Sequence, residues 1–500
     1  MIVSRSPIQS ILSFFLNIHP HETYSVFYST SSFFFVLSAY FVVLPLRDEG
    51  AISLGIGNIP GLFVGSLILT VIAAPLSTLI FSLPNLPKAK ALVLIHRFFS
   101  ASLVLFFILW ALSSPANTFP TFKGFFSMSS TIKEEIKVET EPAPTNPTDW
   151  DKHGWFYISV RIAFFLWVAL LNLITISSTW ARVIDVMDNE SGSRLFGFIG
   201  AGATLGQLFG SLFATIMAWM GPYLFLFAAL LMEFAAQTSK RINKDAIAPS
   251  EELLSLRKTK LDHQDEINES DHKQSSPITS TSNIDSTKPR FWALLDGFSL
   301  IWSSNYLLCV SLYIWLSAIT SSFFYFQKVT VIASTVTTPT ARRRLFAEIN
   351  SYIAIFILAG QLTLTGRILT VAGVTVALCS TPLFSFFNAI WIAVWPTYLS
   401  VAVTEIIRKV ITYVVTRPGR EQLFTVVSQD EKYKAKVCID VLVQRFGDAI
   451  AAGMYKLLYS NHNGKTTHIS LYALPVCLLW VFSGFHLGRR QTQLAKSQNL

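Results

Sequence analysis

The sequence predicts an all-α membrane protein of about twelve transmembrane helices, divided into two groups of six. Three observations support this fold class. Of the 500 residues, 52% are hydrophobic and only 14% are charged, too few charges to cover a water-soluble protein of this size. Apolar segments of about 20 residues, the length that spans a bilayer, recur along the chain. A long polar stretch separates the first six segments from the last six.

The individual segments follow from hydropathy, read in chain order. The first six lie near 26–46, 60–82, 93–113, 155–180, 195–219 and 221–238, and the second six near 304–326, 347–367, 372–393, 395–415, 437–459 and 468–487. Six helices, a polar linker and six more helices is the layout of the major facilitator architecture, whose halves are parallel repeats. We therefore expect an N-terminal segment at 1–25, an N-terminal half at 26–239, a disordered polar linker at 240–290, a C-terminal half at 291–490 and a tail at 491–500.

Basic residues set the expected orientation. Lys and Arg gather in the loops that face the cytoplasm when the N-terminus is inside, so the net charge of +9 indicates membrane topology and not a nucleic-acid partner. Residues 1–21 contain Arg5 and no acidic residue, a composition compatible with organelle targeting. The predicted location is thus the plasma membrane or an organelle membrane. We expect a monomer surrounded by lipid.

Enzyme motifs are absent from the sequence. Gly464-Lys465-Thr466 resembles the end of a phosphate-binding loop, but Tyr459 stands where that loop needs glycine. There is no HExxH and no GxSxG. The four cysteines have no CxxC spacing. We expect no enzyme activity, no cofactor and no metal site.

Several arginines fall within the predicted helices. Ionisable residues at membrane depth are costly, so they are candidates for substrate contact. The best set of substrate-binding cations is Arg47, Arg97, Arg161, Arg408 and Arg445. Snorkelling of their long side chains to the interface is the alternative interpretation.

A second set of charges fits a gating or internal charge network. It comprises Asp48, Asp185, Arg194, Glu405, Lys409, Arg417, Arg420, Asp440 and Asp448. Glu405 can pair with a base three or four residues later, and Arg445 lies one turn from Asp448. For Asp185 and Arg194, between the fourth and fifth helices, a solvated loop is the alternative to a clasp that joins helix ends.

Small residues recur every four positions in the fifth helix, at Gly202, Gly206 and Gly210. Such a stripe lets a neighbouring helix approach closely, because nothing protrudes from that face. We predict a tight helix–helix interface here. The contact either serves packing alone or also slides during transport.

The most specific stretch lies near the C-terminus. It runs from Lys409 through Tyr413 and Arg417-Pro418-Gly419-Arg420-Glu421 to Asp440 and Arg445-x-Gly447-Asp448. This stretch resembles the nucleotide transporter family, which contains the ATP/ADP antiporters of plastids and bacterial parasites and their bacterial relatives. Leu44-Pro45-Leu46-Arg47-Asp48 resembles the end of that family's first helix.

The resemblance implies a major-facilitator-like transporter that exchanges nucleotides. The chain departs from the ATP/ADP exchangers at Arg47, where they carry lysine, and in residues 162–180, which contain no charge. It therefore resembles the broader bacterial relatives more closely.

We thus predict a secondary transporter of an organic anion, preferably a nucleotide or another phosphorylated anion, because a polyphosphate needs several cations to offset its desolvation. Two alternatives stay open. A carrier of an amphiphilic cation would bind it through Glu405, Asp440 and Asp448. A membrane protein that binds a partner or lipid without transport would use the 240–290 loop.

Overall fold

The computed structural model describes residues 22–82, 87–114, 154–186, 189–242, 299–363, 365–427, 435–436, 438–461 and 466–498. These residues form helices and connecting turns, and no strand occurs among them. The predicted linker at 240–290, apart from its first three positions, and residues 1–21 of the N-terminal segment lie outside the described residues. Within the described part, nine helices are long and apolar enough to cross a membrane. The predicted all-α membrane fold is confirmed.

The N-terminal bundle contains six long helices at the predicted positions. They are α2 (Thr23–Ser53), α3 (Ile59–Ser82), α4 (Lys88–Ser113), α6 (Trp155–Val186), α7 (Asn189–Ile216) and α8 (Leu224–Lys240). A short 3₁₀ segment, η5 (Ala218–Tyr223), leads into α8. Helix α2 continues past its predicted end at 46, since Asp48 and Glu49 are buried inside the protein and need not end the helix.

The C-terminal bundle also follows the predicted order. Its helices are α11 (Asn305–Thr335), α12 (Pro339–Thr363), α13 (Thr365–Val394), α14 (Tyr398–Ile411), α15 (Arg417–Gln422), α17 (Gln444–Asn461), α18 (Thr466–Leu471) and α19 (Ala473–Gln498). Two π-helical turns, η6 (Thr412–Thr416) and η7 (Ile439–Val443), interrupt the tenth and eleventh segments. Helices α12, α14 and α17 are not among the nine apolar ones, and α14 has only 14 residues.

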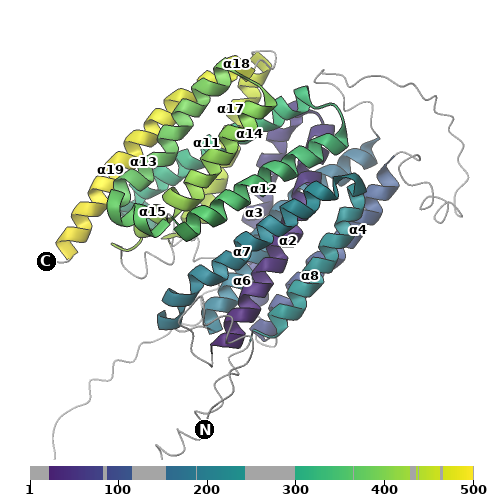
Figure 1. Cartoon of the computed structure of the whole chain (residues 1–500), viewed down its shortest axis with the longest axis horizontal. Coiled ribbons are helices and arrows are strands. Elements are labelled where there is room, and N and C mark those ends of the chain that lie inside the picture. Colours follow the sequence, from purple (N-terminus) through teal and green to yellow (C-terminus); the bar gives the residue numbers. More distant parts are fainter. Residues whose placement is uncertain are drawn as a thin grey trace, which may run out of the picture.

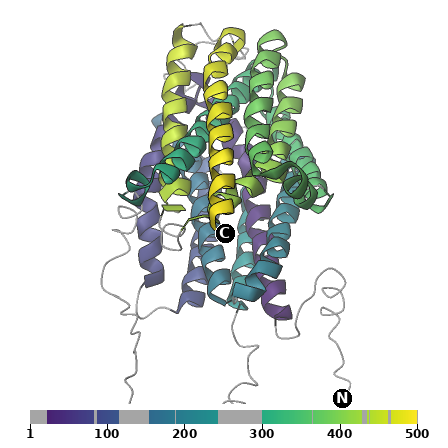
Figure 2. The same ribbon diagram turned by 90° about the vertical axis from the view of Figure 1, so that its left-hand side faces the viewer.

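The two bundles lie side by side, with α7 and α12 at their boundary (Figure 1). On the other side of the boundary, α3 packs against α17. Between α7 and α12, the Thr204 hydroxyl donates to Gln361 at 3.3 Å, and the Thr215 and Ser351 hydroxyls lie 3.4 Å apart. Figure 2 shows the long helices of both bundles running along one common direction. The halves therefore meet through α7 with α12 and α3 with α17, and α2 also packs against α12.

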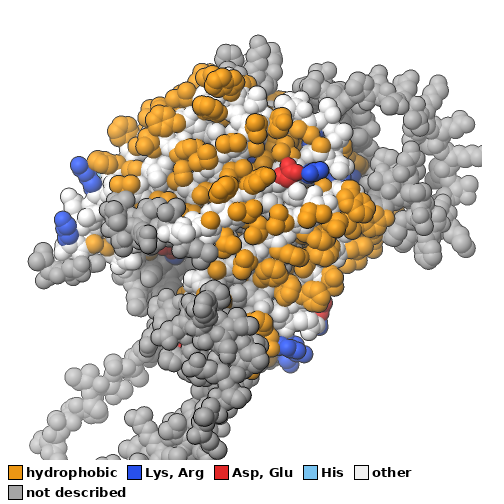
Figure 3. Space-filling view, in the orientation of Figure 1, with side chains coloured by type: hydrophobic (Ala, Val, Ile, Leu, Met, Phe, Trp, Pro, Cys, Tyr) orange, Lys and Arg blue, Asp and Glu red, His pale blue; other side chains and the backbone are white. Residues whose placement is uncertain are grey.

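The outer face of the helices is apolar. In Figure 3, hydrophobic side chains cover most of the described surface of both bundles, and Lys, Arg, Asp and Glu are few. Large apolar side chains such as Ile72, Phe98 and Phe482 are more than half exposed. Contiguous apolar surface of this extent requires lipid and not water around it.

The glycine stripe of α7 faces α2. A Cβ atom added at Gly202, Gly206 or Gly210 would collide with the backbone carbonyl oxygen of Thr30, Phe34 or Ser38, respectively. The Ser38 hydroxyl donates to the Gly206 carbonyl at 3.2 Å and to the Phe34 carbonyl at 2.7 Å. Two helix backbones thus touch where side chains are missing.

Candidate functional site

The end of α2 joins the two bundles through a carboxylate. Arg47 Nη2 lies 2.6 Å from Asp48 Oδ1, and the Tyr325 hydroxyl of α11 donates to the same oxygen at 2.8 Å. The Arg47 guanidinium lies over the Phe165 ring, 5.0 Å from its centroid. Because α2 and α11 belong to different bundles, Asp48 is held by groups from both.

Helix α14 contributes a buried ion pair. Arg408 contacts Glu405 Oε2 through Nη2 at 2.5 Å and through Nε at 3.0 Å. Lys328 of α11 approaches the other carboxylate oxygen at 3.8 Å. The Arg408 side chain is 1% exposed and that of Glu405 is 5% exposed. One carboxylate therefore serves two cations, which leaves this group with a net positive charge.

Two further cations flank Tyr413 in the π-helical turn η6. Lys409 Nζ lies 6.0 Å and Arg417 Cζ 5.4 Å from the Tyr413 ring centroid. Neither cation is within ion-pair distance of a carboxylate that the structure describes. π-Helical turns often occur at functional sites, and this one carries the ring on which two cations stack.

Helix α17 adds the pair that the sequence predicts. Arg445 lies 3.4 Å from Asp448, and the Ser322 hydroxyl of α11 donates to the other side of that carboxylate at 2.5 Å. Across the boundary, Tyr40 of α2 is within electrostatic range of both Arg445 and Tyr413. Arg445 of α17 thus lies near α2 of the N-terminal bundle.

We define the central cluster as these three sets of charged contacts together with Lys409, which lies within electrostatic range of Glu405 and Asp448. Its members are Arg47, Asp48, Lys328, Glu405, Arg408, Lys409, Arg445 and Asp448. Five cations face three carboxylates, an excess of two positive charges. A positive region between low-dielectric walls attracts anions and can offset the desolvation of a negatively charged ligand.

A second layer of pairs lies beyond Arg417. Arg420 contacts Asp440 at 3.1 Å, and Lys436 contacts Glu421 at 2.5 Å. Both pairs are more exposed than those of the central cluster. They connect α15 to the segment that precedes α17.

At the opposite end of the boundary, another ion pair bridges the bundles. Glu49 of α2 lies 3.3 Å from Arg343 of α12, and Arg343 Nε donates to the Ala218 carbonyl at 3.3 Å. The sequence-based orientation places this pair on the outer side. In this conformation, charges therefore fasten the halves together near that side.

Other predicted site residues lie apart from the central cluster. Arg97 pairs with Glu233 at 3.1 Å between α4 and α8, and its side chain is 53% exposed. In this conformation the structure does not bring Arg97 together with the other predicted arginines. The reason is that Arg97 points away from the bundle boundary.

Arg161 is buried within the N-terminal bundle. Its guanidinium lies over the rings of Trp110 at 4.0 Å and Tyr157 at 3.6 Å, and it donates to the hydroxyls of Ser113 and Ser114. These partners explain how a cation is tolerated there without a substrate.

The predicted clasp between the fourth and fifth helices is only partly described. Asp185 lies 3.2 Å from Arg182 on the same helix. The side chain of Arg194 lies outside the described residues.

Sequence reasoning missed Lys328, Tyr325 and Tyr40. Lys328 lies two residues past the predicted end of its helix at 326, but α11 continues to Thr335. The apolar run Val329 to Ala333 is the pattern that could have extended that prediction. Nothing local marks the two tyrosines, since their partners come from other helices.

Comparison of the sequence with protein-family models and with curated proteins gives no match. The structure resembles solved transporters. A mutant of the nucleoside transporter NupG has a TM-score of 0.55 and 12% identity, over 93% of this chain and 99% of that one. A POT family transporter in complex with 5-aminolevulinic acid has a TM-score of 0.55 and 12% identity, over 93% and 96%.

A third similar structure is a bacterial homolog of the human lysosomal transporter Spinster in an inward-facing, unoccupied conformation. Its TM-score is 0.51 and its identity 11%, over 96% of this chain and 99% of that chain. At such identities the likeness shows the fold alone. The fold is the predicted major-facilitator-like architecture of two six-helix halves, and the central cluster lies at the boundary between them.

Proposed function

We propose that this protein is a secondary active transporter that moves an organic anion by alternating access. The proposed substrate is a nucleotide or another phosphorylated anion, exchanged in the manner of ATP for ADP. The observation that carries this proposal is the excess of cations in the central cluster, at the boundary where transporters of this architecture bind their substrates. Two of the similar structures are a nucleoside transporter and a POT family transporter, which is consistent with a small-molecule substrate for this protein.

The cations differ in how strongly they are already engaged. Arg47, Arg408 and Arg445 each have a carboxylate neighbour within 3.4 Å. Among the described residues, Lys409 stacks on the Tyr413 ring and forms no ion pair, and Lys328 lies 3.8 Å from Glu405. The two lysines are therefore the groups most able to transfer their charge to an entering anion. Lysine also suits this role because its charge is a compact point on a flexible stem.

A carrier of an amphiphilic cation is less well supported. It would need free carboxylates, whereas Glu405, Asp440 and Asp448 each contact a cation. A cationic substrate would have to displace an arginine from each of them. The same charges that favour an anion therefore disfavour a cation.

The test is uptake into proteoliposomes. Vesicles loaded with ATP should take up labelled ADP, and sugar phosphates should compete if the site recognises phosphate in general. Lys409→Gln should raise KM about tenfold, since about 1.4 kcal/mol of binding free energy corresponds to that factor. Arg344→Gln is the matched control, because Arg344 is 65% exposed and, among the described residues, pairs with Glu348 on its own helix.

Three outcomes would contradict the proposal. Uptake of organic cations in place of anions would favour the alternative carrier. Equal KM values for the Lys409→Gln and Arg344→Gln variants would remove Lys409 from the site. No uptake of ADP, sugar phosphates or organic cations would favour a membrane protein that binds a partner or lipid without transport.

A further inference from the structure

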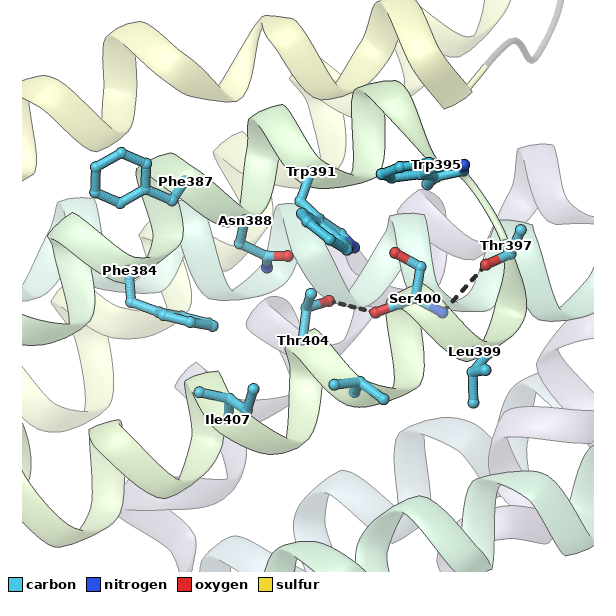
Figure 4. Close-up of a pocket in the computed structure, with 11 residues that line it drawn as sticks. Phe384, Phe387, Asn388, Trp391, Trp395, Thr397, Leu399, Ser400, Thr404 and Ile407 are labelled. Carbon is cyan, nitrogen blue, oxygen red and sulfur yellow. Dashed lines mark hydrogen bonds between the residues drawn. The ribbon is translucent and has the colours of Figure 1, made fainter.

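A groove lies on the outside of the C-terminal bundle, between α13 and α14. It encloses about 490 Å³, within the range of roughly 300–1,000 Å³ that small-molecule sites occupy. Its principal walls are Phe384, Asn388, Trp391, Trp395, Ser400 and Thr404 (Figure 4). None of its lining residues is a member of the central cluster, so the groove needs a separate explanation.

The lining of the groove is apolar and uncharged. None of the side chains that line it is Lys, Arg, Asp, Glu or His. Trp391 and Trp395 are 51% and 58% exposed, and their ring centroids lie 5.4 Å apart. Both tryptophans lie near the turn that joins α13 to α14, as expected for residues at a membrane interface. The groove therefore opens to lipid below this interface.

Two polar atoms in this apolar setting have no partner. Asn388 is 3% exposed, yet its Oδ1 atom receives no hydrogen bond from any residue that the structure describes. The buried Ser400 Oγ atom is likewise unpartnered. Figure 4 shows the two side chains on facing helices, both directed into the space between α13 and α14. A polar atom without a partner is costly in a bilayer, where no water replaces the missing bond.

We propose that this groove binds a sterol taken from the bilayer. A sterol carries one hydroxyl, which can donate to Asn388 Oδ1 and accept from Ser400 Oγ. A phospholipid headgroup would need charged partners, and the groove has none. The rigid ring system of a sterol loses little conformational entropy on binding, and it can lie against Phe384.

The depth of the groove fits this occupant. Asn388 precedes Trp395 by seven residues, about 10 Å along a helix. A hydroxyl held by Asn388 would therefore lie just below the interfacial tryptophans, with the rings reaching toward the middle of the bilayer. This inference is independent of the proposed transport function.

The test uses the full-length protein in nanodiscs of phosphatidylcholine, with sterol, with diacylglycerol or with neither. Binding is measured by energy transfer from tryptophan to the fluorescent sterol dehydroergosterol, and stability by the thermal midpoint. Sterol should raise the midpoint of the wild-type protein. Asn388→Leu and Ser400→Ala should each weaken sterol binding at least tenfold and lose that rise. Trp219→Leu is the control, because Trp219 is 72% exposed on the N-terminal bundle.

The variants should fold without sterol, since leucine in place of Asn388 removes a buried amide whose oxygen is unpartnered among the described residues. Their thermal midpoints in sterol-free nanodiscs check this. An equal rise with sterol in wild type and Asn388→Leu would show a general bilayer effect and overturn the proposal. A rise with diacylglycerol but not with sterol would overturn the choice of occupant.

Discussion

Replacing Arg408 by alanine should destabilise the protein by about 3–5 kcal/mol, the usual cost of breaking a buried ion pair from one side. The structure supports the upper part of this range. Arg408 is 1% exposed and Glu405 5% exposed, and two guanidinium nitrogens contact one carboxylate oxygen. After the substitution, Lys328 at 3.8 Å would be the one ion-pair partner left to Glu405 among the described residues. A buried carboxylate with one distant cation is poorly compensated.

The three-residue arrangement makes the companion variants informative. A double variant, Arg408→Leu with Glu405→Leu, removes the close pair but leaves Lys328 buried without its carboxylate. It should therefore remain destabilised. Adding Lys328→Met should recover most of the lost stability, because replacing a complete buried charge group by apolar residues is often neutral or stabilising. For an isolated pair, the double variant would already recover.

The assay is thermal unfolding in detergent, followed with a thiol-reactive dye. Cys438 and Cys477 are fully buried, so they react only as the protein unfolds; the partly exposed Cys309 and Cys379 are replaced by serine in every variant. Arg344→Ala serves as the control, since an exposed pair such as Arg344–Glu348 contributes about 0–1 kcal/mol. If Arg408→Ala falls within about 1 kcal/mol of this control, the ion pair is not buried in the folded protein. Full recovery in the double variant would remove Lys328 from the group.

Two further predictions concern packing and the anion site. Gly206→Leu should reduce the yield of folded protein more than it changes substrate affinity, because the leucine side chain would meet the α2 backbone. The control is Gly200→Leu, since nothing lies within 4 Å of a Cβ atom added at Gly200. Comparable yields of the two variants would disprove the packing role. The double variant Arg445→Leu, Asp448→Leu should recover the thermal stability that Arg445→Ala loses. It should not recover ADP uptake, since Arg445 also faces the other bundle. Complete recovery of uptake would show that Arg445 and Asp448 form a purely structural ion pair.

The positions of the helices could be predicted because the bilayer simplifies the problem. A spanning helix must satisfy its own backbone hydrogen bonds and present about 20 apolar residues, so length and hydropathy suffice. Residues 155–180 were predicted to span the membrane, and α6 covers Trp155–Val186. The π-helical turns η6 and η7 could not be predicted, since one extra residue in a turn leaves the hydropathy pattern intact.

The site was harder to predict because hydropathy indicates which residues lie within the membrane but not which neighbours their side chains face. Arg97 and Arg408 both lie within apolar segments, yet one is half exposed beside Glu233 and the other is buried beside Glu405. Only the packing of the other helices decides between these outcomes. Lys328 shows the converse: its burial depends on Glu405 from another helix, and the two residues are 77 positions apart.

The arrangement of charges suggests how the central cluster could serve an anion. Each carboxylate has an arginine on its own helix: Asp48 has Arg47, Glu405 has Arg408, and Asp448 has Arg445. Each helix can therefore enter the membrane with its carboxylate already neutralised. The excess positive charge comes from two lysines on different helices, Lys328 on α11 and Lys409 on α14. On the proposed function, a bound anion would neutralise the two excess positive charges of the cluster. To do so, it would have to contact Lys328 and Lys409 at the same time.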